Sequence, residues 1–144
     1  MVPSAEGVLA SADGRTFRSV AARAMTYPRA SYALGRVWIR AEEELLSLAG
    51  GSDALRSVHR TRDGSAITDF AADGTKLVLV TRAGHIELST DAGTTWRDVG
   101  PVGVLHFGAV AHGDGRWIAI GSGLQDEGVV ASSLDGVEWT LAPL

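Results

Sequence analysis

The sequence predicts an all-β protein in which four-stranded antiparallel sheets follow one another along the chain. Short strand-like segments alternate with turn residues, and the chain has 18 glycines against 4 prolines among 144 residues. A turn motif with Ser, Asp and Gly recurs. Two segments, Leu77-Val78-Leu79-Val80 and Trp117-Ile118-Ala119-Ile120, are apolar without alternation. Because continuous apolar strands are buried on both faces, each sheet is expected to lie between two others.

The turn motif is most complete in residues 89–96, which read Ser-Thr-Asp-Ala-Gly-Thr-Thr-Trp between two strand-like segments. The Asp91 carboxylate is suited to accept hydrogen bonds from backbone N–H groups just ahead of it. Gly93 allows a positive φ, and Trp96 is suited to pack between layers. A catalytic or metal-binding Asp91 is the alternative, but the turn chemistry favours a structural role.

Three weaker copies flank this motif. Residues 11–17 keep Ser, Asp, Gly and Thr with Phe in place of Trp, residues 133–139 keep Asp, Gly and Trp, and residues 49–55 are the weakest copy. The anchors at positions 17, 55, 96 and 139 are separated by 38, 41 and 43 residues, a period typical of four-stranded repeats. The residues given a structural role in these turns are Ser11, Asp13, Gly14, Phe17, Ser89, Asp91, Gly93, Trp96, Ser133, Asp135, Gly136 and Trp139.

The motif and its copies resemble the Asp-box (BNR) repeat of β-propellers, which is found in sialidases, sortilin-type receptors and photosystem assembly factors. The resemblance implies that each box lies on the outer turn of a blade, away from the central site. It covers the repeats but not the sialidase active site, which uses three arginines, a tyrosine nucleophile and acidic partners. Here Tyr27 and Tyr32 are the only tyrosines, and neither has an evident acidic partner.

The first units are predicted as follows. Residues 7–12 and 16–21 form a hairpin that corresponds to the outer two strands of a blade. The next blade has strands at 30–34, 36–40, 45–49 and 55–60. A one-turn helix over residues 41–46 is the alternative there, since Glu and Leu favour helices, although Gly50-Gly51 would end such a helix soon after it begins.

The later units repeat the same order. Strands are expected at 66–71, 76–81, 85–89 and 95–99, and then at 107–111, 116–121, 129–132 and 138–141. The whole chain is therefore predicted to be one partial propeller, with a half-blade at 6–21 and blades at 26–60, 65–100 and 104–142. Propellers close with about 4–8 blades, so three and a half blades leave an incomplete ring.

Composition excludes several classes of site. The net charge of −4 argues against non-specific nucleic-acid binding. The absence of cysteine excludes disulfides and thiolate metal sites, and the four histidines do not follow zinc-ligand spacings. We expect no cofactor and no metal. No run approaches the ~18 apolar residues of a membrane span, and no signal peptide is expected; the cell compartment is not predicted.

Strand directions place a candidate ligand site. Connections from the fourth strand to the next first strand, and from the second to the third, share one face of a propeller, and the boxes lie on the other. The candidate ligand-binding residues on that face are Tyr27, Arg29, Arg62, Arg82, His85, His106 and Asp126. The alternative for each is a solvated loop residue.

The leading functional hypothesis is a non-catalytic propeller that acts as a binding or assembly scaffold for a protein or glycan. The alternative is part of a carbohydrate-active enzyme, whose two acids ~5–9 Å apart would come from residues 42–44 and 126–127; solvated acids are the simpler explanation. No nucleic acid or membrane partner is expected.

A blade face without a neighbour is expected to expose Trp117, Ile118 and Ile120. Repeat units bury such surface only against neighbours or polar caps. We therefore expect either a homo-oligomer or further blades of the same propeller.

Overall fold

The computed structural model describes residues 8–21, 25, 28–48 and 55–144. These residues form antiparallel sheets and no helix, so none of them lies in a helix long and apolar enough to cross a membrane. The first sheet is a hairpin of β1 (Val8–Ala10) and β2 (Arg18–Ala21).

Three four-stranded sheets follow, each with its strands in sequence order. The second sheet contains β3 (Arg29–Ala33), β4 (Arg36–Ala41), β5 (Glu44–Leu48) and β6 (Leu55–Arg60). The third contains β7 (Ile67–Asp73), β8 (Lys76–Thr81), β9 (Ile86–Ser89) and β10 (Arg97–Asp98). The fourth contains β11 (Val104–Gly113), β12 (Arg116–Gly123), β13 (Gly128–Ser133) and β14 (Thr140–Pro143). We call them the second, third and fourth blades.

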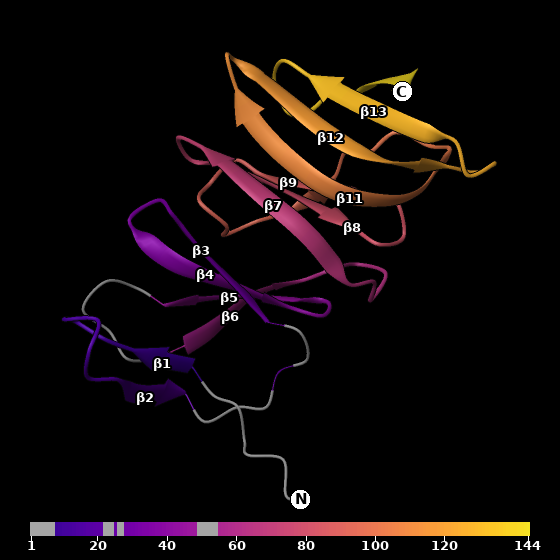
Figure 1. Cartoon of the computed structure of the whole chain (residues 1–144). Helices are drawn as coiled ribbons and strands as arrows, with labels where there is room; N and C mark the ends of the chain where they lie inside the picture. The colour runs from indigo at the N-terminus through magenta and orange to yellow at the C-terminus, as the bar shows by residue number, and fades with distance from the viewer. Residues whose placement is uncertain (1–7, 22–24, 26–27, 49–54) are drawn as a thin grey trace, which may run out of the picture.

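The sheets are stacked in chain order, with the fourth blade at the top of the view and β1–β2 at the bottom (Figure 1). The third blade is covered on both faces because alternate side chains of β8 enter different cores. Leu77 and Leu79 join Trp38 of the second blade in one cluster, whereas Val78 and Val80 join a cluster with the fourth blade. All four are fully buried, which confirms the prediction for this strand.

A polar bridge crosses the inner strands of all three blades. One carboxylate oxygen of Asp69, on β7, accepts a hydrogen bond from Arg40 Nη1 on β4 at 2.8 Å. The other accepts one from the backbone N–H of Val110 on β11 at 3.1 Å. Arg40 also donates to the carbonyl oxygen of Thr68. One carboxylate therefore fixes the relative position of three sheets.

Residues 41–46 form a turn and a strand, so the one-turn helix considered for this segment is wrong. Glu42 has φ of +54° and turns the chain between β4 and β5. Leu45 and Leu46 then enter different cores, on opposite faces of the sheet. This period of two overrides the helical propensity of Glu and Leu.

The fourth blade is covered on one face only, and burial along β12 therefore alternates. Trp117 and Ala119 are buried toward the third blade, whereas Ile118 is half-buried and Ile120 is 44% exposed. The expectation that Trp117 would be exposed is wrong, because its side chain points inward and packs against His112 with ring centroids 4.4 Å apart. Ile118 and Ile120 remain on the uncovered face.

Substitution in β8 tests the packing of one blade against the next. We expect Leu79→Ala to lower the free energy of unfolding by about 2–5 kcal/mol, because it opens a cavity between the second and third blades. Leu134→Ala is the control, since Leu134 is 72% exposed and exposed substitutions change stability by less than about 0.5 kcal/mol. Urea denaturation followed by tryptophan fluorescence measures both; equal effects would contradict the packing.

Candidate functional site

The ends of the blades differ in structure. At one end lie the connections from β6 to β7 and from β10 to β11, together with the β4–β5, β8–β9 and β12–β13 turns. We call this end the loop face; it lies toward the right in Figure 1. The turns with the Ser and Asp motif join β1 to β2, β9 to β10 and β13 to β14 at the other end.

A pocket of about 320 Å³ opens on the loop face between the second and third blades. We call it the arginine pocket; its lining residues are Arg29, Arg40, Glu42, Ala66, Ile67, Thr68 and Arg82. Backbone hydrogen bonds fix its walls. The N–H of Ile67 donates to the carbonyl of Glu42 at 2.8 Å, and the N–H of Arg82 donates to the carbonyl of Ala66 at 2.9 Å.

The three arginines of this pocket are in different states. Arg40 is held by Asp69 and Thr68, and its side chain is 18% exposed. Among the residues that the structure describes, no group accepts a hydrogen bond or forms an ion pair with the guanidinium groups of Arg29 and Arg82, which are exposed. Planar guanidinium groups bind carboxylates and phosphates through two parallel hydrogen bonds. The pocket is therefore suited to an anionic group.

A second pocket of about 290 Å³ lies on the same face and is lined by Arg62, Asp63, His85, Glu87 and Asp98. His85 bridges two carboxylates, with Nδ1 at 2.7 Å from Asp98 Oδ2 and Nε2 at 3.3 Å from Asp63 Oδ2. Burial acts to raise the pKa of Asp63, but hydrogen bonds from the Ser65 hydroxyl and N–H, together with His85, lower it overall. Within the described residues no group of three His, Asp or Glu side chains is arranged to hold a metal ion.

Glu87 of this second pocket is buried and its oxygens are already bonded. One accepts a hydrogen bond from the N–H of Arg62 at 3.1 Å, and the other pairs with His59 Nε2. The His59 ring stacks on Trp96 at 4.7 Å with 20° between planes. These contacts join the second blade to the third, so Glu87 acts as a structural group between blades.

The structure separates the predicted ligand residues into groups. Arg29 and Arg82 line the arginine pocket, Arg62 and His85 line the second pocket, and His106 and Asp126 lie on the fourth blade and line neither. Tyr27 lies outside the described residues.

Sequence reasoning missed Arg40, Asp63, Glu87 and Asp98 as pocket residues. Arg40 lies at the end of a predicted strand, where it was not counted with the loops. No pattern in the sequence pairs Asp98 with His85, because the two meet only through the β9–β10 register and the turn that precedes it.

The predicted turn chemistry is present around Asp91. Its carboxylate accepts hydrogen bonds from the Thr95 N–H at 2.8 Å and the Thr95 hydroxyl at 2.6 Å. Ser89 Oγ donates to Asp91 at 2.8 Å and accepts from the N–H of Gly93 at 2.8 Å. Gly93 has φ of +93°, and a Cβ there would lie 2.9 Å from the Trp38 ring of the second blade. Trp96 is half-buried and donates its indole N–H to the Gly93 carbonyl at 3.0 Å.

The turns at Asp13 and Asp135 repeat this arrangement with one residue fewer between Ser and Gly. Asp13 accepts from the N–H groups of Arg15 and Thr16, each at 2.8 Å, and Gly14 and Gly136 each donate their N–H to the Ser of their own turn at 2.8 Å. Phe17 is 58% exposed, so it does not anchor the Asp13 turn as Trp96 anchors the Asp91 turn. The proposed copy at Ser52 and Asp53 lies outside the described residues.

These hydrogen bonds lower the pKa of each turn carboxylate. The Thr95 hydroxyl and N–H, followed by the Ser89 hydroxyl, lower the pKa of Asp91 to about 2. The N–H groups of Glu138 and Val137 lower the pKa of Asp135, and those of Thr16 and Arg15 lower the pKa of Asp13.

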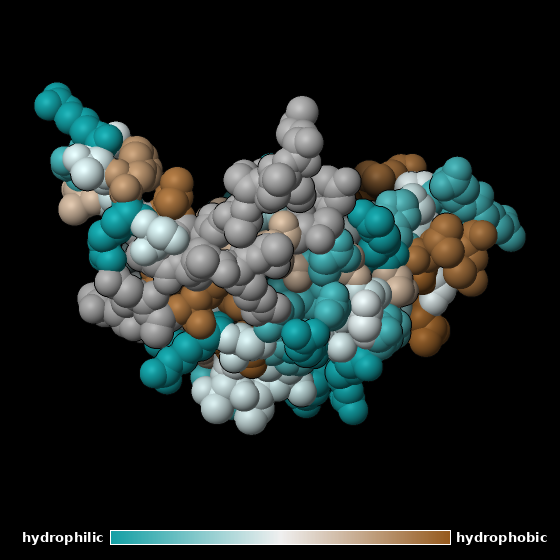
Figure 2. Space-filling model, turned by 90° about the horizontal axis from the view of Figure 1, so that it is seen from below, coloured by the Kyte–Doolittle hydropathy of each residue, from teal (hydrophilic) through white to brown (hydrophobic). Residues whose placement is uncertain are grey.

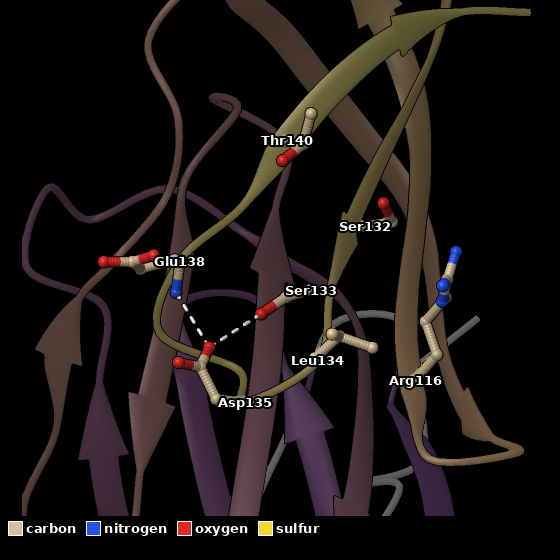
Figure 3. Close-up of a pocket in the computed structure, with 7 residues that line it drawn as sticks. All are labelled: Arg116, Ser132, Ser133, Leu134, Asp135, Glu138 and Thr140. Carbon is tan, nitrogen blue, oxygen red and sulfur yellow. Dashed lines mark hydrogen bonds between the residues drawn. The ribbon is translucent and has the colours of Figure 1, made fainter.

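The largest of the three pockets, about 380 Å³, lies beside the Asp135 turn. Figure 3 shows Asp135 turned back toward Ser133 and the backbone of Glu138, whereas Arg116 extends away from the turn. Oδ1 of Asp135 is therefore committed to the turn. The arginine pocket, in which the guanidinium groups of Arg29 and Arg82 have no partner among the described residues, is the better candidate for a ligand despite its smaller volume.

Comparison with known proteins shows the fold. No protein-family description matches the chain, and no curated protein sequence matches it. Among solved structures, "YCF48 bound to D1 peptide" aligns with a TM-score of 0.61 and 14% identity over 81% of this chain and 41% of that one. YCF48 from Cyanidioschyzon merolae aligns with a TM-score of 0.59 and 13% identity over 81% of this chain and 37% of that one.

The chain thus spans less than half the length of these two structures. At such low identity the likeness concerns the fold. It agrees with the all-β architecture of four-stranded blades in an incomplete ring, as predicted.

The Asp91 turn generates two predictions about stability. We expect Ser89→Ala to lower the free energy of unfolding by about 1–3 kcal/mol, since it leaves the buried Gly93 N–H without its acceptor. Urea denaturation measures this change, and Thr90→Ala, at an exposed position in the same turn, is the control. Equal midpoints for both variants would contradict the role of Ser89.

Acid dependence tests Asp91 itself. Its folded pKa of about 2 lies below the ordinary value of 3.8, so its ionised form stabilises the fold above pH 4, and this stabilisation is lost as the pH falls toward 2. Asp91→Asn should therefore lower the denaturation midpoint at pH 7, and the difference from the natural protein should shrink between pH 4 and pH 2. A difference that stays constant over this range would show that the carboxylate charge is not involved.

Proposed function

We propose that this β-propeller is a binding module that takes an anionic peptide segment in the arginine pocket. The observation that carries the proposal is a pocket of about 320 Å³ with two guanidinium groups that have no partner among the described residues, beside a third that is fixed. Because Arg40 is already neutralised by Asp69, the free charge of Arg29 and Arg82 is available to a ligand.

The physical properties of the pocket support a carboxylate-bearing peptide. Asp and Glu side chains and a C-terminal carboxylate match the paired donors of a guanidinium group. One of the two similar YCF48 structures is bound to a peptide, which supports the view that this fold accommodates peptides.

We assign the three described Ser and Asp turns to the Asp-box class on the basis of their hydrogen bonds. In this proposal they stabilise the outer ends of the blades and take no part in binding. Half-blade 6–21 and blades 26–60, 65–100 and 104–142 then form one domain, whose ligand lies at the opposite end from the boxes.

We further propose that the uncovered face of the fourth blade is covered in the assembled particle. The register places Ala109, Ile120, Val130 and Ala142 side by side across this face, and Ile120 is 44% exposed. A face of this kind is of the order of 800 Å² per partner, which is the size of a standard interface. A second copy of the chain or further blades of the same protein would bury it.

Self-association is measured by analytical ultracentrifugation of residues 1–144 at micromolar concentration. We expect a species larger than the 15.0 kDa chain, and Ile120→Glu should shift it toward the monomer because a charge is costly in an apolar interface. Leu134→Glu, at an exposed position on a turn, is the control. A soluble 15.0 kDa species that does not aggregate would contradict the proposal.

Peptide binding is tested with two fluorescein-labelled pools of octapeptides. One has two central aspartates with three randomised residues on each side, and the other has two central asparagines in their place. We expect the aspartate pool to bind and the asparagine pool not to, and Arg29→Ala and Arg82→Ala each to weaken binding about tenfold or more, since a hydrogen bond to a charged group is worth about 1.5–3 kcal/mol. Fluorescence anisotropy gives the affinities.

Arg116→Ala is the matched control, because it removes one exposed arginine from the opposite end of the fourth blade. Equal losses for Arg116→Ala and Arg82→Ala would reveal general charge attraction instead of a site. Equal affinity for the two pools would reject the anionic ligand.

A further inference from the structure

We propose that the anionic peptide carries apolar side chains next to its acidic group, and that an exposed apolar surface of the fourth blade binds them. This surface, the apolar ledge, consists of Val102, Leu105 and Leu124. The inference rests on the proposed function of the arginine pocket, which it extends by naming the second element of the ligand.

The ledge consists of exposed apolar side chains at one end of the fourth blade, with Val102 in the connection that leads into β11. Val102 is 93% exposed, Leu105 is 51% exposed and Leu124 is 69% exposed. The pairing of Val104 with Gly123 brings Leu105 and Leu124 to the same end of the β11–β12 ladder. This is the right-hand end of the blade in Figure 1, and Figure 2 shows brown hydrophobic surface at the right-hand edge of the molecule. Isolated exposed leucines are ordinary, but a gathered patch at a face is typical of a binding surface.

Local contacts hold the ledge in place. The backbone passes so closely that a Cβ on Gly121 would lie 2.1 Å from the carbonyl oxygen of His106. In the β12–β13 turn, the N–H of Gly123 donates to the carbonyl of Glu127 at 2.7 Å, and the N–H of Gln125 donates to the Glu127 carboxylate at 2.9 Å. A backbone that is already fixed loses little further conformational entropy on binding.

The β8–β9 turn borders the arginine pocket and also contacts the strand that carries Leu105. Arg82, which lines the pocket, donates its N–H to the carbonyl of Ala66 in the same blade. Two residues later, Gly84 lies against β11: a Cβ there would be 2.2 Å from the Val104 carbonyl oxygen and 3.3 Å from the carbonyl carbon of Leu105. The turn that carries Arg82 therefore touches the start of β11 next to Leu105, and we place the peptide across this turn.

The surroundings of the ledge favour a peptide over a lipid surface. Asp126 and Glu127 are exposed in the turn that carries Leu124, and Glu42 lies in the arginine pocket. The chain as a whole has a net charge of −4. These carboxylates repel the many charges of an anionic membrane, whereas a single acidic group on a peptide approaches only the guanidinium groups of Arg29 and Arg82.

Two further octapeptide pools, both with central aspartates, test the ledge by fluorescence anisotropy. The outer positions carry leucine, valine and alanine in the apolar pool, and serine, threonine and glycine in the polar pool. We expect the natural protein to bind the apolar pool about tenfold more tightly, since each buried methylene contributes about a fourfold gain in affinity. The double variant Leu105→Ser/Leu124→Ser should bind both pools with the affinity of the polar pool.

The matched control is Leu134→Ser, which removes a leucine that is 72% exposed at the other end of the same blade; it should keep the tenfold preference. Arg82→Ala should weaken both pools equally. If the natural protein binds the two pools with equal affinity, the proposal that the ledge binds apolar side chains is wrong, whereas the proposal for the arginine pocket is unaffected. If neither pool binds, the proposed function itself is overturned.

A vesicle experiment distinguishes a peptide from a membrane surface as the partner of the ledge. We expect the natural protein to stay in the supernatant when vesicles of phosphatidylcholine and phosphatidylglycerol are sedimented. Sedimentation that the Leu105→Ser/Leu124→Ser variant loses would overturn the peptide in favour of a membrane surface. Thermal melts of every variant check the fold, which these exposed substitutions should leave unchanged.

Discussion

The blades of this protein depend on one another because the sheet at the centre of the stack has two apolar faces. Along β8, Leu77 and Leu79 pack toward the second blade, and Val78 and Val80 pack toward the fourth. A sheet with two apolar faces is stable only between two others. The position of every loop follows from this constraint, since stacking in register places all equivalent connections at the same end of the blades.

Polar contacts supply what apolar packing leaves undefined. The hydrophobic effect is non-directional, so apolar packing holds two sheets together without fixing the rotation between them. Asp69 provides direction, because its two oxygens are bonded to Arg40 on one neighbour and to the Val110 N–H on the other. The Glu87 and His59 pair does the same farther from the inner strands. At the opposite ends, the Ser and Asp turns bond their own backbone and need no partner strand.

Much of the fold could be predicted from the sequence, whereas the site could be predicted only in part. The turn at Asp91 follows local rules, because its hydrogen bonds join residues at most four positions apart. The strand β10 is shorter than predicted since Thr95 is held by Asp91 and cannot join the ladder. Arg40 and Asp69 are 29 residues apart, and no local pattern links them. Contacts between blades therefore lie beyond what spacing in one chain can show.

In the proposed function, stability and binding occupy opposite ends of this architecture, and the distribution of charge explains why the two need not conflict. At the end with the Ser and Asp turns, Oδ1 of Asp13, Asp91 and Asp135 accepts hydrogen bonds from backbone N–H groups of its own turn. In the arginine pocket, Asp69 pairs with Arg40, whereas no described residue pairs with the guanidinium groups of Arg29 and Arg82. A ligand carboxylate that enters there replaces water around guanidinium groups that are already exposed. The fold pays no desolvation cost to keep them, because they become buried only when their partner arrives.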